Sequence, residues 1–480
     1  MTINDFEVLK PYTLLTVWAC ILLLVDLFIP KERKGITALL SALGLAITLG
    51  FTLAQIGNER SGFTGMVVLD GFSTFVNALL LVSGLLGVAL AYGYVKRMNI
   101  ERGEYYTLLL FSVTGMMLMA QASDLIVVFI ALELLSIPLY VLAAFNRTKS
   151  ESEEAGLKYF LLGAFATGFV VYGTALVFGA TGSTNLSAIV TSASAGTSSL
   201  LLTIGAALIL VGFGFKIAAV PFHMWTPDVY QGAPSAVTAF MSSGAKIAGF
   251  AALLRVFATA FPSLATDMTD VLWALAAATM ILGNVIAISQ TNIKRLLAYS
   301  SIAHAGYILM AFVPYGNPTV RDVSIAAGLF YLVSYAVTNF GAWGVVIALE
   351  KAEGKGLEIA DYAGLGRKYP ALAAAMTVFM LSLIGFPPTL GMVGKFYLFR
   401  SVIAGGYTWL AIIGVLTSLI SAYYYLRVVV TMYMKDGEPV TERETWLALT
   451  TGVTAVITVV VSLVPQYLFA WASDAVLKLF

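Results

Sequence analysis

Five ionisable side chains lie within stretches of the sequence that are otherwise apolar. They are Glu133, Lys216, Lys246, His304 and Lys395. A charged lysine or carboxylate at the centre of a bilayer costs about 2.5 to 3.5 kcal/mol on insertion scales. Burial favours the neutral amine of a lysine, whereas a nearby carboxylate favours the ammonium. A buried lysine whose carboxylate partner approaches and withdraws can therefore hold and release a proton in mid-membrane.

Each of these residues also has a simpler explanation. A lysine near a helix end can extend its amine to the membrane surface, and a lone histidine can satisfy a bond between helices. Lys246 lies in the middle of its apolar stretch, so surface extension does not explain it. For the other four the simpler explanations stay open. Because opposite charges can pair, we expect Glu133 to form an ion pair with Lys216, directly or through water.

Proline and glycine residues lie close in sequence to two of these ionisable residues, Lys216 and Lys395. Pro221 follows Lys216 in "AAVPF", and Pro387 and Pro388 precede Lys395 in "GFPPTLGMVG". Because proline removes a helical hydrogen bond, we expect helices interrupted within 216–225 and within 383–395. Interrupted helices in corresponding positions of two halves point to ion sites in transporters, although a simple proline kink is the alternative.

The surrounding sequence is that of a membrane protein. Of 480 residues, 59% are hydrophobic and 11% charged, against about 25% charged in an average soluble domain. Recurrent apolar runs are each long enough to cross a hydrocarbon core of about 30 Å. The sequence predicts one all-α, polytopic transmembrane domain over 1–480. The fourteen predicted spans are 12–30, 36–56, 73–95, 104–121, 124–144, 156–180, 199–222, 234–257, 270–290, 297–314, 322–350, 371–403, 407–433 and 446–474.

Basic residues in the loops predict the orientation. Placing the N-terminus outside leaves 16 basic residues in inner loops and 6 outside, so both termini are expected to face outward. The start, "MTINDFEVLK", is acidic and no small-residue cleavage site follows it, so we expect no removable signal peptide. The outer basic set is Lys10, Arg60, Arg255, Arg321, Arg400 and Lys478.

The residues that usually hold cofactors are scarce. Cys20 is the single cysteine, and His223 and His304 are the two histidines, so we expect no disulfide, zinc site, iron–sulfur cluster or haem in this chain. No P-loop, dinucleotide fingerprint or basic stripe is present, and we expect no nucleic-acid partner.

A weak internal repeat also occurs. "GLKYFLLGA" at 156 and "GLFYLVSYA" at 328 share four residues at an offset of 172, and Lys216 and Lys395 are 179 residues apart. That offset corresponds to five predicted helices. An odd number of helices reverses direction in the membrane, so the sequence predicts two inverted five-helix repeats, 104–257 and 270–433, with the broken helices seven and twelve in equivalent positions.

Several segments resemble the antiporter-like membrane subunits of respiratory complex I, the proton-pumping NADH:quinone oxidoreductase. They are "GEYYTLLLFSVTGMMLMAQASDLIVVFIALELLSIPLYVLAAF", "GFGFKIAAVPFHMWTPDVYQGAPSAVTAFMSSGAKIAG", "QTNIKRLLAYSSIAHAGYILM" and "GFPPTLGMVGKFYLF". Within that family the chain is most similar to the subunit N group, whose mitochondrial and chloroplast counterparts are subunits 2 and B. Lys395, where subunit M is expected to carry glutamate, supports this placement, as does the absence of the lateral arm of subunit L.

The resemblance implies a role for each buried residue. Glu133 would be the helix-five glutamate, Lys216 its partner lysine on broken helix seven, and Lys246 the central lysine of helix eight. His304 would link two half-channels, and Lys395 would be the terminal lysine of broken helix twelve. Its place in the outer part of that helix predicts that it releases protons outward, although it could also simply extend toward the outer surface.

Two further residues match positions that the family uses. Lys158 would belong to the proton path or anchor its helix at the inner membrane face, and the role of His223 is equally open. The resemblance implies that FMN, iron–sulfur clusters and quinone bind to other subunits, and that electron transfer there drives the protons. It also implies the neighbouring antiporter-like subunit M and the small subunits K and J as partners, in a bacterial cytoplasmic membrane. The alternative is a subunit of a multisubunit sodium/proton antiporter, and a third possibility is a membrane-filling scaffold.

Overall fold

A computed structural model describes residues 3–194, 200–442 and 444–476, and these residues are almost entirely helical. Membrane-spanning chains favour helices because every backbone polar group is then satisfied within its own segment. The helices that build the first part of the chain are α1 (Ile3–Asp26), α2 (Gly35–Leu53), α3 (Gly71–Arg97), α4 (Gly103–Gln121), α5 (Leu125–Ala143), α6 (Ser150–Thr181), α7 (Leu186–Ser194), α8 (Leu200–Ile217), α9 (Trp225–Gly232), α10 (Ser235–Phe240) and α11 (Lys246–Ala260). Those that follow are α12 (Ala265–Ala287), α13 (Ile293–Met310), α14 (Arg321–Leu349), α15 (Leu365–Lys368), α16 (Pro370–Ile384), α17 (Leu390–Ala404), α18 (Thr408–Met434), α19 (Thr445–Leu463) and α20 (Gln466–Asp474).

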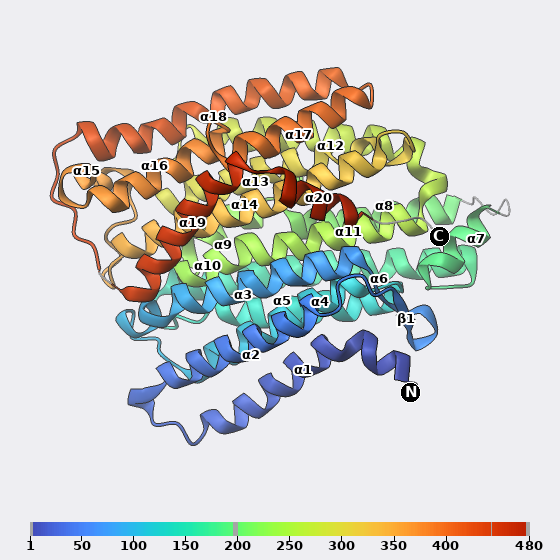
Figure 1. The fold of residues 1–480 in the computed structure, drawn as a ribbon, viewed down its shortest axis with the longest axis horizontal. Helices are drawn as coiled ribbons and strands as arrows, with labels where there is room; N and C mark the ends of the chain where they lie inside the picture. Colours follow the sequence, from blue (N-terminus) through green and yellow to red (C-terminus); the bar gives the residue numbers. More distant parts are fainter. Residues whose placement is uncertain (1–2, 195–199, 443, 477–480) are drawn as a thin grey trace.

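The long helices lie side by side along one direction (Figure 1). Twelve segments of the described chain are long and apolar enough to cross a membrane. The two other predicted spans correspond to α4, with 19 residues, and to the pair α16 and α17, each too short to cross alone. The all-α, polytopic prediction is confirmed.

Burial separates a central group of helices from an outer one. The most apolar window of Ser235–Ala260 is 100% buried, and that of Ile293–Gly316 is 94% buried, against 28% for α1 and 28% for α19. In Figure 1, α1 and α2 form the lower edge and α18 the upper edge, with α11, α13 and α14 between them. The helices that carry Lys246 and His304 are therefore shielded from lipid on every side.

Both predicted interruptions are present. Helix α8 ends at Ile217 and α9 begins at Trp225, while α16 ends at Ile384 and α17 begins at Leu390. A third deviation was not predicted: the residues Met241–Ala245 between α10 and α11 form a π-helical turn, η3. Such turns occur frequently at functional sites because they widen the helix and redirect side chains.

One predicted span was wrong, and one local feature was not predicted. The predicted span 446–474 divides into α19 and α20 around Pro465, since proline cannot donate the hydrogen bond that would continue the helix. The loop before α3 also contains a short antiparallel hairpin, β1 (Arg60–Gly62) and β2 (Val67–Leu69). Its strands have three residues each, too few for an alternating pattern to show in the sequence.

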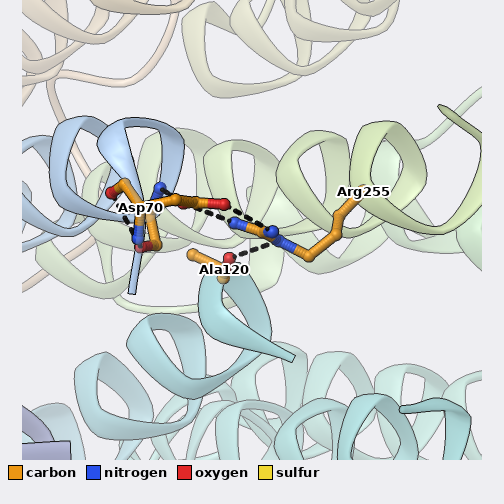
Figure 2. A network of polar contacts seen from close by, with 4 residues as sticks. Asp70, Ala120 and Arg255 are labelled. Atoms are coloured by element: carbon orange, nitrogen blue, oxygen red, sulfur yellow. Dashed lines mark hydrogen bonds and ion pairs between the residues drawn. The ribbon is translucent and has the colours of Figure 1, made fainter. Parts of the chain in front are cut away.

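A buried ion pair on α11 joins the start of α3 and the end of α4 (Figure 2). Arg255 binds both carboxylate oxygens of Asp70 at 2.9 Å, and its Nε donates to the carbonyl oxygen of Ala120 at 2.8 Å. Asp70 also caps α3 by accepting from the backbone N–H of Ser73. Burial favours the neutral acid, but the Arg255 guanidinium and the Ser73 N–H outweigh it and hold the pKa of Asp70 below its usual range. Arg255, which the loop count had placed among the outer basic residues, is 3% exposed within α11.

Candidate functional site

The predicted ion pair between Glu133 and Lys216 is not a direct contact. No ion pair within 4.0 Å joins them in the part of the chain that the structure describes. The carboxylate of Glu133, on α5, accepts from the hydroxyl of Thr167 at 2.7 Å. Lys216 Nζ, in the last turn of α8, donates to Ser136 Oγ at 2.8 Å and to Tyr159 OH at 3.3 Å. Ser136, one turn after Glu133, thus occupies the place expected for the carboxylate, and a water-mediated contact stays a prediction.

The side-chain stem of Lys216 packs against α11 at Gly249, on the helix that carries Lys246. A Cβ atom at position 249 would lie 3.0 Å from Ile217 Cγ2 and 3.3 Å from Lys216 Cγ, so the lysine stem crosses α11 where that helix has no side chain. Gly249 is three residues after Lys246 and shares its helix face. The two lysines are 4% and 2% exposed.

Lys246 begins α11 immediately after the π-helical turn and points to α13. Its Nζ donates to the backbone carbonyl oxygen of Ser301 and lies 5.8 Å from the centroid of the Tyr335 ring. Tyr335 in turn donates to Ser301 Oγ at 2.8 Å. No carboxylate lies within ion-pair distance of Lys246 among the described residues. A proton on this amine is thus held by the Ser301 carbonyl oxygen, with the Tyr335 ring beside it.

His304, one turn after Ser301 on α13, lies between two tyrosines. Its Nδ1 is 2.7 Å from Tyr331 OH, and its Nε2 is 3.2 Å from Tyr425 OH. A neutral imidazole donates from one ring nitrogen and accepts at the other, so it can take a proton on one side while giving one up on the other. The ring is 3% exposed. This geometry fits a relay between two hydroxyls.

Lys395 turns back into the interruption of its own helix. Its Nζ donates to the carbonyl oxygens of Leu383 and Ile384 at 3.0 and 2.9 Å, and to Ser418 Oγ at 2.6 Å. Those carbonyls are free because α16 ends there and leaves its last acceptors without helical partners. Lys395 is 4% exposed, and the alternative in which it extends toward the outer surface is wrong for this structure.

Tyr307 completes the connection between His304 and Lys395. It lies one turn after His304, and Lys395 Nζ is 4.4 Å from its ring centroid. Ser418 Oγ, which accepts from Lys395, donates to Tyr307 OH at 3.2 Å. We call the resulting series of buried residues the polar line; it consists of Lys216, Lys246, Ser301, His304, Tyr307 and Lys395.

Lys158 and His223 lie outside the polar line. Lys158 forms ion pairs with Glu154 and Asp228, both at 2.7 Å, and its side chain is 40% exposed. His223 lies in the interruption between α8 and α9, and no side-chain hydrogen bond joins it to the polar line within the described ranges. Of the two readings of Lys158, this position near the start of α6 favours the anchor.

The partner residues of the polar line were missed from the sequence. They are uncharged serines and tyrosines within apolar helices, where such residues are common. One signal was present: Ser136, Ser301 and Tyr307 each lie three residues from an ionisable residue on the same helix, the spacing of neighbours on one helix face. No group of three or more histidine, cysteine, aspartate or glutamate side chains that could hold a metal ion occurs among the described residues.

The site tolerates little change at Gly385, and this gives a prediction. Gly385 has φ +90°, a left-handed conformation that disfavours other residues, and a Cβ there would lie 2.9 Å from Lys395 Cδ. Gly385→Ala is expected to displace Lys395 and reduce proton translocation by the assembled complex. Gly406→Ala is the matched control, since Gly406 also has φ +90° but nothing lies within 4 Å of its added Cβ. If both variants translocate protons equally, the effect of Gly385→Ala comes from backbone strain and not from displacement of Lys395.

Comparisons with known proteins show the family of this chain. A sequence profile of the family described as "NADH:quinone oxidoreductase/Mrp antiporter, TM" matches residues 122–421, which contain the whole polar line. The chain belongs to this family of antiporter-like membrane subunits. Its relatives include NADH-quinone oxidoreductase subunit N of Trichlorobacter lovleyi, which is 49% identical over 99% of this chain and 97% of the relative. The similarity to the subunit N group is thereby confirmed.

Solved structures show the same fold. A chain of respiratory complex I from Thermus thermophilus, solved with bound aureothin, matches 96% of this chain and 99% of its own length, with a TM-score of 0.83 and 36% identity. A chain of the Mrp complex from Dietzia sp. matches with a TM-score of 0.86 at 20% identity, covering 99% of this chain and 97% of its own length. At that identity the second likeness supports the fold alone.

Proposed function

We propose that this chain moves protons across a membrane as a non-redox, antiporter-like subunit of an NADH:quinone oxidoreductase. The observation that carries the proposal is the polar line, in which three buried lysines and one histidine each contact hydroxyl or carbonyl oxygens within the bundle. Keeping several ionisable groups in a membrane interior costs too much for a scaffold that only fills space. Electron transfer in other subunits would drive the protons.

The contacts suggest an order of steps. At Lys216 the proton is held by the hydroxyl oxygens of Ser136 and Tyr159, which accept from Nζ at 2.8 and 3.3 Å. From there it would pass to Lys246, beside the carbonyl oxygen of Ser301, and on to the hydroxyls around His304. Lys395, at the far end, receives the proton through Tyr307 and Ser418. Glu133, one helical turn before Ser136 on α5, would stabilise the positive charge on Lys216.

The sides of the membrane follow from the loop charges. The basic-loop end of the bundle, which we define by the loops 27–34, 98–102 and 350–364, would face the cytoplasm of a bacterial host. Both termini would then lie on the outer, periplasmic side, and Lys395 would release protons outward. In support, α1 begins and α20 ends toward the opposite end of the bundle from these loops (Figure 1).

Two inverted repeats account for the position of the breaks. In 104–257 the interrupted helix α8–α9 is fourth of five, and in 270–433 the interrupted helix α16–α17 is likewise fourth of five. Each repeat thus contributes one half-helix end and one lysine beside it, Lys216 and Lys395. Lys158 and His223 belong to the first repeat and would act near its basic-loop end.

The proposed partners are the other membrane subunits of the complex, including subunit M and the small subunits K and J, while FMN, iron–sulfur clusters and quinone would bind elsewhere in it. Purifying the tagged chain from its native membrane is expected to retrieve flavin and iron–sulfur proteins with NADH:quinone activity. Retrieval of a complex that lacks them and exchanges sodium for protons would instead favour a sodium/proton antiporter.

A further inference from the structure

A polar cavity of about 530 Å³ opens at the basic-loop end of the bundle. It lies where α6 and α13 begin and where α14 ends. Its lining includes charged residues from separate elements: Lys149, Lys158, Asp228, Lys294, Glu350 and Glu353. A cavity of this size and polarity holds water, because its walls supply many hydrogen-bond partners.

Glu350 is the buried acid of this cavity. It is the C-cap residue of α14 and is 4% exposed. Its Oε2 atom is buried and has no hydrogen-bond partner among the described residues. Leaving a buried charged oxygen without a partner is expensive, so such an atom usually indicates a bound water or a group that exchanges protons.

Lys294 is the buried base of the same cavity. It is 2% exposed, and its Nζ donates to the carbonyl oxygen of Ala233 at 2.7 Å, which keeps the amine in place. No ion pair within 4.0 Å joins Glu350 to Lys294 or to any other base that the structure describes. The acid is therefore near a cation but not locked to it, and it can accept a proton without breaking a salt bridge.

A polar group near Lys246 lies on the same face of α14 as Glu350. On α14, Asn339 lies eleven residues before Glu350, about three helical turns, and so shares its helix face. Asn339 Nδ2 donates to Ser242 Oγ at 2.7 Å and to Ser243 Oγ at 2.9 Å. Both serines belong to the π-helical turn that precedes Lys246. On α13, Lys294 lies seven residues before Ser301, again on one face.

We propose that Glu350 is a further proton-transfer residue, which loads protons from water in this cavity into the polar line. Its carboxylate takes a proton from a hydronium ion, leaving water behind, and gives that proton up, by way of water and the hydroxyls of Ser242 and Ser243 that Asn339 holds in place, to the neutral amine of Lys246. The carboxylate is then ready for the next proton. This inference rests on the proposed function and adds the point at which protons leave the aqueous phase.

The titratable groups around Glu350 come from several elements. Tyr94 faces it from α3, Lys294 from α13, and Tyr362 from the short 3₁₀ helix Ile359–Tyr362. Lys149 and Asp228 line the same cavity from the start of α6 and from α9. A pH profile of translocation therefore has to be compared between variants that differ in one carboxylate only.

The test compares Glu350→Gln with Glu353→Gln in the assembled complex. Glu353 lines the same cavity but is exposed, and the glutamine keeps size and hydrogen bonding in both variants. Glu350→Gln is expected to move fewer protons per electron in proteoliposomes and to change the pH profile, while Glu353→Gln behaves as the wild type. Wild-type translocation by Glu350→Gln at every pH would overturn the inference.

A second variant keeps the test decisive if Glu350→Gln fails to assemble. The double change Ser242→Ala and Ser243→Ala removes both hydroxyls of the connecting step with little change in volume, and it is expected to lower translocation in the same way. Wild-type translocation by this double variant would also overturn the route. If Lys246→Met loses translocation while these variants do not, the inference fails and the proposed function stands.

Discussion

Replacing Asp70 with asparagine is expected to lower the thermal stability of the complex more than most other single changes in this chain. Arg255 is 3% exposed, and both of its terminal nitrogens bind the Asp70 carboxylate. Removing one partner of a buried pair leaves the other charge uncompensated and costs about 3 to 5 kcal/mol. Because the guanidinium also binds the Ala120 carbonyl oxygen, the substitution is expected to weaken the packing of α3, α4 and α11 against one another.

An exposed pair provides the control. Asp322 forms an ion pair with Arg321 at 2.9 Å, but its side chain is 59% exposed, so Asp322→Asn is expected to cost at most about 1 kcal/mol. The measurement is the Tm of the purified complex for both variants. A Tm of Asp70→Asn equal to that of Asp322→Asn would show that the buried pair contributes no stability.

The Asp70 pair also predicts a dependence on pH. Its carboxyl has a pKa below the usual range in the folded chain. A group with a lowered folded pKa stabilises the fold above its unfolded pKa, which is about 3.9 for aspartate, and loses that contribution as the pH falls through the folded value. The Tm difference between wild type and Asp70→Asn is therefore expected to be constant near neutral pH and to shrink in acid.

The second large effect is expected from Lys246→Met. Methionine has about the length of lysine and no charge, so it fills the same space beside Ser301 and Tyr335 without a proton to carry. Since the wild-type amine has no carboxylate partner within ion-pair distance in the described chain, its removal leaves no buried charge behind. The variant is therefore expected to assemble normally while proton transfer between Lys216 and His304 is interrupted.

The sequence predicted the residues of the site better than their contacts. Charged residues in apolar helices and prolines beside them are visible without a structure, because each is costly unless it serves a purpose. The partner of Lys216 was not predictable, since it depends on how α5 and α8 rotate against each other. Glu133 and Ser136 share one face of α5, so a shift of about one turn along the helix axis exchanges them.

Other differences have equally local causes. Lys395 turns inward because the interruption at Ile384 exposes carbonyl oxygens, which a linear sequence does not display. Arg255 resembled an outer loop residue because its buried partner, Asp70, is 185 positions away in the sequence. The cavity with Glu350 was missed because its walls come from segments that meet only in the folded bundle.

The number of protons moved per electron by Lys246→Met tests the central claim most directly. The assembled complex would be placed in proteoliposomes, and proton uptake would be measured during NADH oxidation alongside the wild type. If protons cross through the polar line, the variant moves fewer protons per electron, or loses electron transfer together with proton movement where the two are strictly coupled. A fully assembled Lys246→Met complex with the wild-type ratio and rate would contradict the account.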